Sequence, residues 1–194
     1  VSVLSENLMK WGNSNVVVTN NDPADFSLLE GCFDVVLVDA PCSGEGMFRK
    51  DEDAIGEWSE EHVKLCAARQ HRILETVLKL LKPSGILVYT TCTFSEEENE
   101  AHFATLKSEF DSVRLNLNTD WGIVETNKNE AYGYRFYPHK VKGEGFFLTC
   151  FKKKNMAREG IWPINKKGVD KLSKNQQLSL GKWLKHSEDF ESHF

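Results

Sequence analysis

Apolar and polar positions change their spacing along the first 150 residues in a way that predicts strands and helices in turn. Short β-branched runs are typical of strands, whereas apolar residues at three- and four-residue spacing are typical of helices. The predicted strands are residues 16–19, 33–39, 86–91, 113–117, 134–137 and 145–151. The predicted helices are residues 4–11, 60–81 and 95–110. This alternation indicates an α/β fold with a mostly parallel sheet, and the two late strands indicate an antiparallel hairpin at one edge.

The two longest predicted helices begin at recognisable capping residues. Ser59 precedes the first of them, and its side chain can accept a hydrogen bond from the first turn. We expect the apolar face of that helix to consist of Leu65, Ala68, Ile73, Val77, Leu80 and Leu81. Ser95 stands three residues before Glu98, which is the spacing of a capping box and predicts that the next helix starts there.

The composition is that of a chain able to bury a core, with 40% hydrophobic and 27% charged residues. The net charge of −5 hides an asymmetry, because residues 1–134 carry a net −12 and residues 135–185 a net +10. A basic segment beside an acidic one suggests a nucleic-acid-binding surface, although a solvated lysine-rich tail gives the same count. No apolar run approaches the roughly 20 residues of a membrane helix, and no signal-peptide pattern is present, so we expect a cytoplasmic protein without membrane contact.

Five cysteines are present, with no Cys-x-x-Cys pair and no cluster at metal-ligand spacing, so we expect free thiols and no metal site. Cys42 and Cys92 each follow the end of a predicted strand. Ligands of open α/β sheets bind beyond the carboxyl ends of the strands. We therefore expect the two thiols in one crevice, on adjacent strands, with the carboxylate of Asp39 beside them. The helix predicted after Cys92 would lower the pKa of its thiol.

Two thiols and a carboxylate suit the chemistry of methylation at C5 of cytosine. C5 is a poor nucleophile, but a thiolate that adds to C6 makes C5 enamine-like, so that it can attack an electrophilic methyl group. A carboxyl group at N3 and the exocyclic amine would stabilise the charge that develops on the ring. The C5 proton must then leave before the bond between enzyme and base can break, and a second thiol can assist that step.

Three stretches resemble the Nol1/Nop2/Sun family of RNA cytosine-5 methyltransferases, and together the resemblance covers about residues 1–153. Residues 39–50 (Asp-Ala-Pro-Cys-Ser-Gly-Glu-Gly-Met-Phe-Arg-Lys) resemble its proline–cysteine motif and are most similar to the bacterial branch that modifies small-subunit ribosomal RNA. Residues 91–100 resemble its threonine–cysteine motif, and residues 135–147 its closing strand pair. The resemblance implies a Rossmann-like fold and an enzyme that uses S-adenosylmethionine to methylate cytosine C5 in RNA. The RNA class that it implies is ribosomal RNA.

The resemblance also implies roles for individual residues. Cys92 would be the nucleophile at cytosine C6, Cys42 would assist release of the methylated base, and Asp39 would contact the cytosine. The residues expected at the cofactor are Asp22, Asp39 and Pro41. The residues expected to contact RNA are Arg49, Lys50, His139 and Lys140.

The family's glycine-rich cofactor loop falls upstream of residue 1 in this resemblance. We therefore expect residues 1–154 to form part of a catalytic domain, without the N-terminal strands that carry that loop. Gly44-Glu45-Gly46 and Gly143-Glu144-Gly145 do not follow a strand and open a helix, so we interpret them as turns. Residues 155–194 are expected to be a basic linker or the start of a truncated C-terminal RNA-binding region.

Other interpretations stay open at this point. The chain could be a non-catalytic fragment that binds RNA or a partner, which the missing glycine-rich loop favours for the isolated chain. It could also act on transfer RNA rather than ribosomal RNA. An amino-group methyltransferase would carry an Asn/Asp-Pro-Pro-aromatic motif in place of residues 39–42 and would need no thiol. A DNA cytosine methyltransferase would use Cys42 as its nucleophile and leave Cys92 idle.

Overall fold

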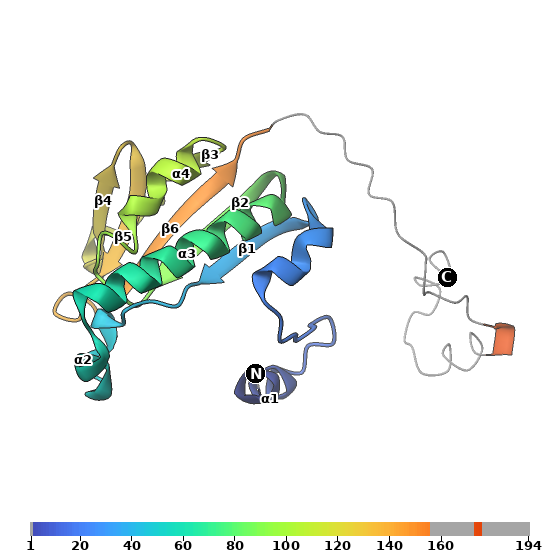
Figure 1. Cartoon of the computed structure of the whole chain (residues 1–194), viewed down its shortest axis with the longest axis horizontal. Coiled ribbons are helices and arrows are strands. Elements are labelled where there is room, and N and C mark those ends of the chain that lie inside the picture. The colour runs from blue at the N-terminus through green and yellow to red at the C-terminus, as the bar shows by residue number, and fades with distance from the viewer. Residues whose placement is uncertain (1, 156–172, 176–194) are drawn as a thin grey trace. The chain divides into compact units, whose positions relative to one another are not determined.

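The computed structural model describes residues 2–155 and 173–175 (Figure 1). Most of the predicted basic region 155–194 therefore lies outside the described residues. The helices are α1 (Ser2–Trp11), η1 (Pro23–Leu29), η2 (Glu45–Met47), α2 (Asp53–Glu57), α3 (Glu60–Leu80), η3 (Glu100–His102), α4 (Phe103–Lys107) and η4 (Thr119–Trp121), where η denotes a 3₁₀-helix. The strands are β1 (Phe33–Asp39), β2 (Leu81–Thr91), β3 (Phe110–Ser112), β4 (Val124–Lys128), β5 (Ala131–Phe136) and β6 (Phe146–Lys153).

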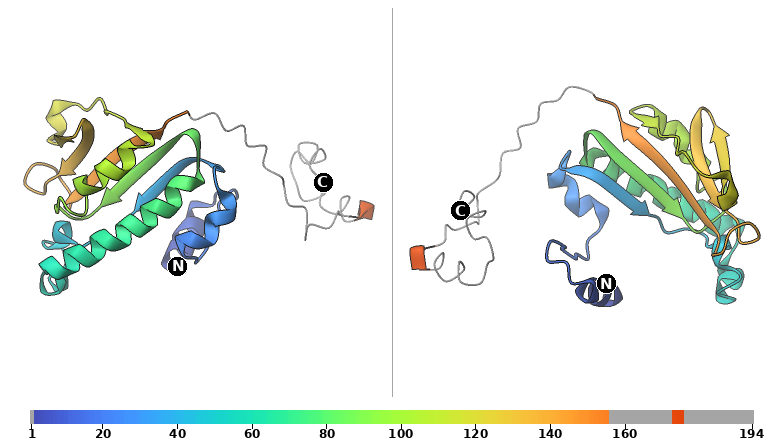
Figure 2. Two further views of the ribbon diagram at one scale, coloured as in Figure 1. Left: turned by 45° about the horizontal axis from the view of Figure 1, so that its top comes forward. Right: turned by 180° about the vertical axis from the view of Figure 1, so that it is seen from behind.

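One mixed sheet organises the described residues, with the strand order β1-β2-β6-β5-β4, and β3 also pairs with β6 (Figure 2). β1 and β2 are parallel, whereas the other four strand pairings are antiparallel. The predicted α/β arrangement and the antiparallel β5–β6 pair are both present, and the antiparallel part extends further, to β4 and β3. In the parallel pair Val38 lies opposite Tyr89, and Asp39 lies opposite Thr90. The carboxyl ends of β1 and β2 therefore lie side by side, as predicted.

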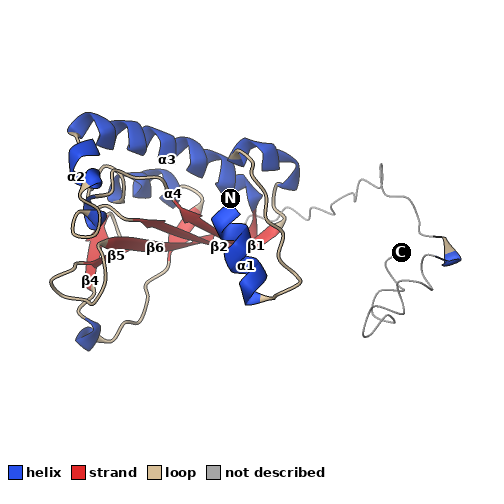
Figure 3. Ribbon diagram, turned by 90° about the horizontal axis from the view of Figure 1, so that it is seen from below, coloured by secondary structure: helices blue, strands red, loops and turns tan. Residues whose placement is uncertain are grey.

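Helix α3 connects these two parallel strands and packs with α4 on one face of the sheet (Figure 3). As predicted, Ser59 caps it, and the Ser59 hydroxyl oxygen accepts a hydrogen bond of 3.1 Å from the backbone N–H of His62. The core beneath the helices contains Leu74, Val77, Leu81, Leu87, Tyr89, Phe103, Phe147 and Phe151. The start of the predicted apolar face is wrong, because Leu65 is 66% exposed and Ala68 is exposed, whereas Val63 and Cys66 are buried.

Three predicted elements differ in the structure. Residues 16–19 form no strand, and Val17 is 87% exposed, because none of the described strands pairs with this segment. The strand predicted at residues 113–117 lies earlier, as β3, and β4 falls in a stretch predicted to be a polar loop. The helix predicted from Ser95 begins only at η3 and α4, because the Glu98 side chain does not cap it but turns inward and is fully buried.

Candidate active site

The two cysteines predicted to share a crevice are in direct contact. Cys42 follows β1 and Cys92 follows β2, and their sulfur atoms lie 3.0 Å apart. The backbone N–H of Cys92 also donates to the Cys42 sulfur over 3.2 Å. At the carboxyl ends of the same two strands, the Thr90 hydroxyl donates to a carboxylate oxygen of Asp39 over 3.1 Å, and the Asp39 side chain is exposed. The structure therefore brings together the three residues that the sequence predicted as catalytic.

The contact between the thiols separates their acidities. The hydrogen bond from Cys42 lowers the pKa of Cys92 to about 7, against the opposing effects of burial and of the negative charge on Asp39. The pKa of Cys42 is raised by the same hydrogen bond and by burial. The predicted cause was a helix beginning just after Cys92, but the first helical turn starts only at Glu100. Cys92 is therefore the more acidic thiol of the pair, and Cys42 the less acidic one.

Three loops meet at this pair: the proline–cysteine loop (residues 40–50), the threonine–cysteine loop (residues 92–99) and the hairpin loop (residues 137–145). The Gly46 N–H donates to the Cys92 carbonyl, and the Gly145 N–H donates to the Gly46 carbonyl, both over 2.8 Å. A Cβ atom on Gly46 would collide with the Gly145 carbonyl and lie 2.7 Å from the Cys92 carbonyl oxygen. Two glycines interpreted as simple turn residues therefore allow the loops to approach each other closely.

Buried polar residues that the sequence reasoning did not assign to the site lie beneath these loops. The Glu98 carboxylate accepts hydrogen bonds from Ser43 and Gln70, and Gln70 also donates to the Pro41 carbonyl. Arg135 forms a buried ion pair with Glu100, at 2.6 Å, and donates to the carbonyl of Phe94 over 2.6 Å. The Arg-Phe-Tyr-Pro and Glu-Glu-Glu-Asn-Glu stretches that carried the family resemblance were the available signal, because each contributes a partner to these contacts.

The residues predicted to bind the cofactor have mixed surroundings. Pro41 is exposed beside Cys42. Both carboxylate oxygens of Asp22 accept hydrogen bonds of 3.0 Å from the guanidinium group of Arg72 on α3, which lowers the pKa of Asp22. Asp22 also caps η1 through the N–H of Ala24. Its described hydrogen bonds therefore join η1 to α3, and its assignment to the cofactor stays a prediction.

All four residues predicted to contact RNA, Arg49, Lys50, His139 and Lys140, are exposed. The ring of His139 lies against that of Tyr137, with 5.5 Å between the ring centres. Arg49 is engaged within the protein, because its guanidinium group donates to the Gly143 carbonyl over 2.7 Å and pairs with Glu144 at 3.2 Å. Arg49 thus fastens the proline–cysteine loop to the hairpin loop, and its predicted contact with RNA is untested.

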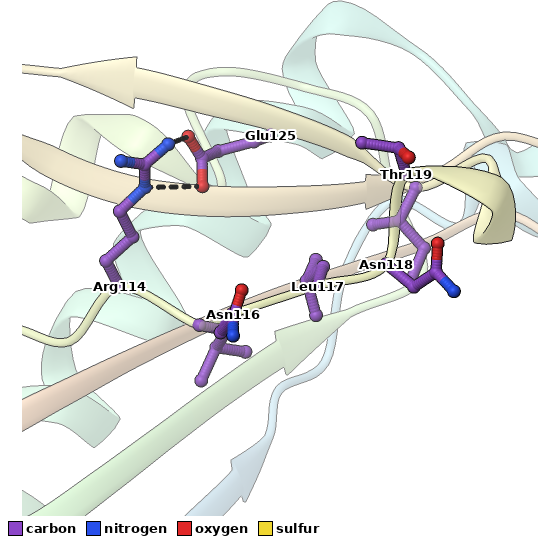
Figure 4. A pocket seen from close by; sticks show the side chains of 8 residues that line it. Arg114, Asn116, Leu117, Asn118, Thr119 and Glu125 are labelled. Atoms are coloured by element: carbon purple, nitrogen blue, oxygen red, sulfur yellow. Dashed lines mark hydrogen bonds and ion pairs between the residues drawn. The ribbon is translucent and has the colours of Figure 1, made fainter.

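In the described part of the chain, neither of two surface pockets is lined by Cys42 or Cys92. One, of about 420 Å³, lies between residues 114–119 and β4, and the ion pair of Arg114 with Glu125 borders it (Figure 4). The other, of about 370 Å³, is lined by Glu45, Trp58, Glu60, Val63, Lys64, Ser95 and Glu97. Among the described residues no group of three His, Cys, Asp or Glu side chains could hold a metal ion. No helix in the described part of the chain is long and apolar enough to cross a membrane.

Sequence comparison points to one family. The family model described as 16S rRNA methyltransferase RsmB/F matches residues 1–152. The chain is 38% identical over 196 residues to the ribosomal RNA small subunit methyltransferase F of Vibrio vulnificus, covering 97% of this chain and 41% of that protein. It is 38% identical over 171 residues to the protein of the same name from Aeromonas salmonicida, covering 87% of this chain and 36% of that protein. The chain therefore spans about two fifths of the length of these relatives.

Solved structures show the same relationship. NSun6 from Pyrococcus horikoshii, crystallised with SFG, matches with a TM-score of 0.60 and 25% identity, over 77% of this chain and 38% of that one. A methyltransferase homologue from the same organism matches with a TM-score of 0.58 and 31% identity, over 77% of this chain and 48% of that one. These matches confirm the predicted Rossmann-like methyltransferase fold.

Proposed function

This chain belongs to the RsmB/F family of 16S rRNA methyltransferases, and from that premise we propose that its protein methylates C5 of a cytosine in RNA through a covalent thiol adduct. The observation that carries the proposal is the 3.0 Å contact between Cys42 and Cys92 at the ends of two parallel strands. Small-subunit ribosomal RNA as the substrate, S-adenosylmethionine as the methyl donor and a cytoplasmic location are parts of the same proposal. A transfer RNA substrate is its alternative.

Cys92 is the residue that attacks the base. With a pKa of about 7, a large share of its thiol is ionised at neutral pH. The thiolate sulfur adds to C6 of the cytosine, and the electron pair of the C5–C6 double bond moves to C5. Asp39, exposed at the end of β1, can donate or accept a hydrogen bond at N3 and the exocyclic amine as charge develops on the ring. A DNA-type mechanism would instead need Cys42 to be the thiolate, whereas its pKa is the one that is raised.

S-adenosylmethionine supplies the electrophilic methyl group that C5 attacks. Asp39 and Pro41 are exposed next to Cys42, so this chain has a carboxylate and an apolar ring to place beside such a donor. After methyl transfer a solvent water accepts the C5 proton, the electron pair of that C–H bond reforms the C5–C6 double bond, and the Cys92 sulfur departs with the electron pair of its bond to C6. Cys42, 3.0 Å from that sulfur, assists by returning a hydrogen bond to the departing thiolate.

The proposal is tested with the complete gene product and RNA that carries 5-fluorocytosine, because fluorine at C5 cannot leave as a proton does and the adduct is trapped. Wild type, Cys92→Ser and Cys42→Ser are incubated with this RNA and S-adenosylmethionine and run on a denaturing gel. We expect a shifted covalent band for wild type and for Cys42→Ser but none for Cys92→Ser.

Two other outcomes would change the assignment. A band that persists without Cys92 and disappears without Cys42 would reverse the roles of the thiols. RNA binding without an adduct in any variant would favour the non-catalytic, RNA-binding interpretation. Parallel reactions with ribosomal and transfer RNA would separate the two substrate classes.

A further inference from the structure

A fully buried carboxylate lies between the two cysteine loops. One oxygen of Glu98 accepts hydrogen bonds from the backbone N–H of Ser43 over 2.9 Å and from the side-chain amide of Gln70 over 3.0 Å. Its other oxygen accepts from the Ser43 hydroxyl over 2.5 Å and from the Thr93 hydroxyl over 3.3 Å. The four donors come from the proline–cysteine loop, from α3 and from the threonine–cysteine loop, so one side chain joins three segments that are distant in sequence.

Gln70, also fully buried, completes the connection from the helix. Its amide nitrogen donates to the Pro41 carbonyl over 2.9 Å as well as to Glu98, and its amide oxygen accepts from the ring of His102 over 3.1 Å. Pro41 and Ser43 are the neighbours of Cys42 in the chain. The backbone on both sides of Cys42 is therefore anchored, by Gln70 on one side and by Glu98 on the other.

A buried carboxylate is a costly way to fill space. Removing a carboxylate from water is unfavourable unless hydrogen bonds replace its hydration, and an apolar side chain of similar size would pack at less cost. Here four hydrogen-bond donors compensate the cost of burying Glu98. Three of them lie in the loops that contain Cys42 and Cys92, and the fourth is the side-chain amide of Gln70 on α3. This arrangement indicates that Glu98 positions these segments rather than merely filling space between them.

We propose that Glu98, together with Gln70, is a positioning residue that sets the sulfur–sulfur contact between Cys42 and Cys92. Neither residue reaches the sulfur atoms through a described hydrogen bond, so they act through the backbone of the proline–cysteine loop. The description of the thiols as catalytic rests on the proposed function, whereas the positioning itself can be measured on the thiols alone.

Glu98 can change the pKa of Cys92 in two opposite directions, so the sign of the change tests the proposal. The groups that act on the Cys92 thiol are Cys42, which lowers its pKa and has the largest influence, and Asp39 and Glu98, whose negative charges raise it. From α3, Cys66 also interacts electrostatically with Cys92. If Glu98 acts only as a charge, its neutralisation lowers the pKa of Cys92. If it holds Cys42 in place, its neutralisation weakens the thiol–thiol hydrogen bond and raises that pKa.

The experiment measures how fast iodoacetamide alkylates Cys92 as a function of pH in the complete gene product, by mass spectrometry of the Cys92 peptide. Glu98→Gln replaces one acceptor oxygen by a donor without changing size, and Gln70→Met removes the anchor on Pro41 without changing any charge. Both variants should move the alkylation midpoint to higher pH, and a midpoint that is higher by one pH unit means about tenfold slower alkylation at pH 6. The control Thr149→Val removes a hydrogen bond of 2.7 Å to the Tyr132 carbonyl, between β6 and β5, and should leave the midpoint unchanged.

A midpoint that falls or stays constant in Glu98→Gln, or stays constant in folded Gln70→Met, would overturn the proposal. Circular dichroism establishes which variants fold, and if Glu98→Gln does not, Gln70→Met decides alone because it carries no change of charge. The assay needs neither RNA nor a methyl donor. Absence of the 5-fluorocytosine adduct would therefore count against the proposed function, while the alkylation midpoints would still decide the positioning of the thiols.

Discussion

At the residue scale, His102 is a histidine that the fold keeps neutral. Burial lowers its pKa to about 4, and the nearby ring of His71, 6.4 Å away between ring centres, adds to the effect. Its Nε2–H is the donor in the hydrogen bond to Gln70, because the amide oxygen there can only accept. Since Gln70 holds Pro41 and Glu98, His102 is connected through one hydrogen bond to the residues that support the cysteine pair.

We predict that His102 makes the protein less stable as the pH falls from about 6.5 to about 4. The unfolded chain takes up the histidine proton at its ordinary pKa of 6.5, whereas the folded chain does so only near 4. The contribution is therefore complete above pH 6.5 and is lost progressively below it, by on the order of 3 kcal/mol in total. Urea unfolding of wild type and His102→Gln at pH 7.5 and 4.5 measures it. Carboxylates contribute equally to both proteins, so equal losses of unfolding free energy in the two would contradict the prediction.

At the element scale, the site depends on how closely the loops approach each other. We predict that Gly46→Ala separates the proline–cysteine loop from the hairpin loop, because its Cβ would collide with the Gly145 carbonyl and crowd that of Cys92. Such overpacking typically costs about 1–3 kcal/mol, and here the displacement falls next to the thiols. Adduct formation with 5-fluorocytosine RNA should fall at least tenfold while the protein remains folded.

Gly56→Ala is the matched control for this variant. Gly56 lies in α2, and a Cβ atom there would meet nothing within 4 Å. Alanine also favours the helix over glycine, so stability should stay equal or rise slightly. Equal adduct formation in the Gly46 and Gly56 variants would show that the loops tolerate separation.

The elements also show which parts of the fold the sequence could predict. Ser59 was recognised because capping is local: a side chain bonds to its own first turn. Ser95 and Glu98 have the same local pattern, yet Glu98 bonds instead to Ser43, 55 residues earlier in the chain. Residues 16–19 have strand propensity, but a strand needs a partner, and periodicity does not specify pairing. The cysteine pair could be predicted because it lies at the ends of two strands. The buried residues beneath it, Glu98 and Gln70, could not, because their roles depend on contacts between residues far apart in the sequence.

At the scale of the whole chain, the excess of basic residues after residue 134 suggested a nucleic-acid-binding surface, but some of these residues bind within the protein. Lys153 donates to the carbonyls of Leu78 and Leu81, each over 3.0 Å, and so holds the C-terminal end of α3. Lys154 donates to the carbonyl of Lys107 over 3.0 Å. Charge counted along the sequence therefore overstates the charge available to a nucleic acid. Exposed lysine side chains are better candidates for contacts with phosphate.

We predict that Lys50 and Lys140, both exposed on loops that meet at the cysteine pair, contribute phosphate contacts to RNA. Each contact to single-stranded RNA releases condensed counterions, so Lys50→Ala and Lys140→Ala should each reduce the slope of log affinity against log salt by about 0.7. Filter binding of the complete gene product between about 50 and 200 mM salt measures this slope. Lys82→Ala is the control, because Lys82 is paired with Asp34 at 2.8 Å. If the control changes the slope as much as the loop lysines do, binding follows net charge and does not depend on this surface.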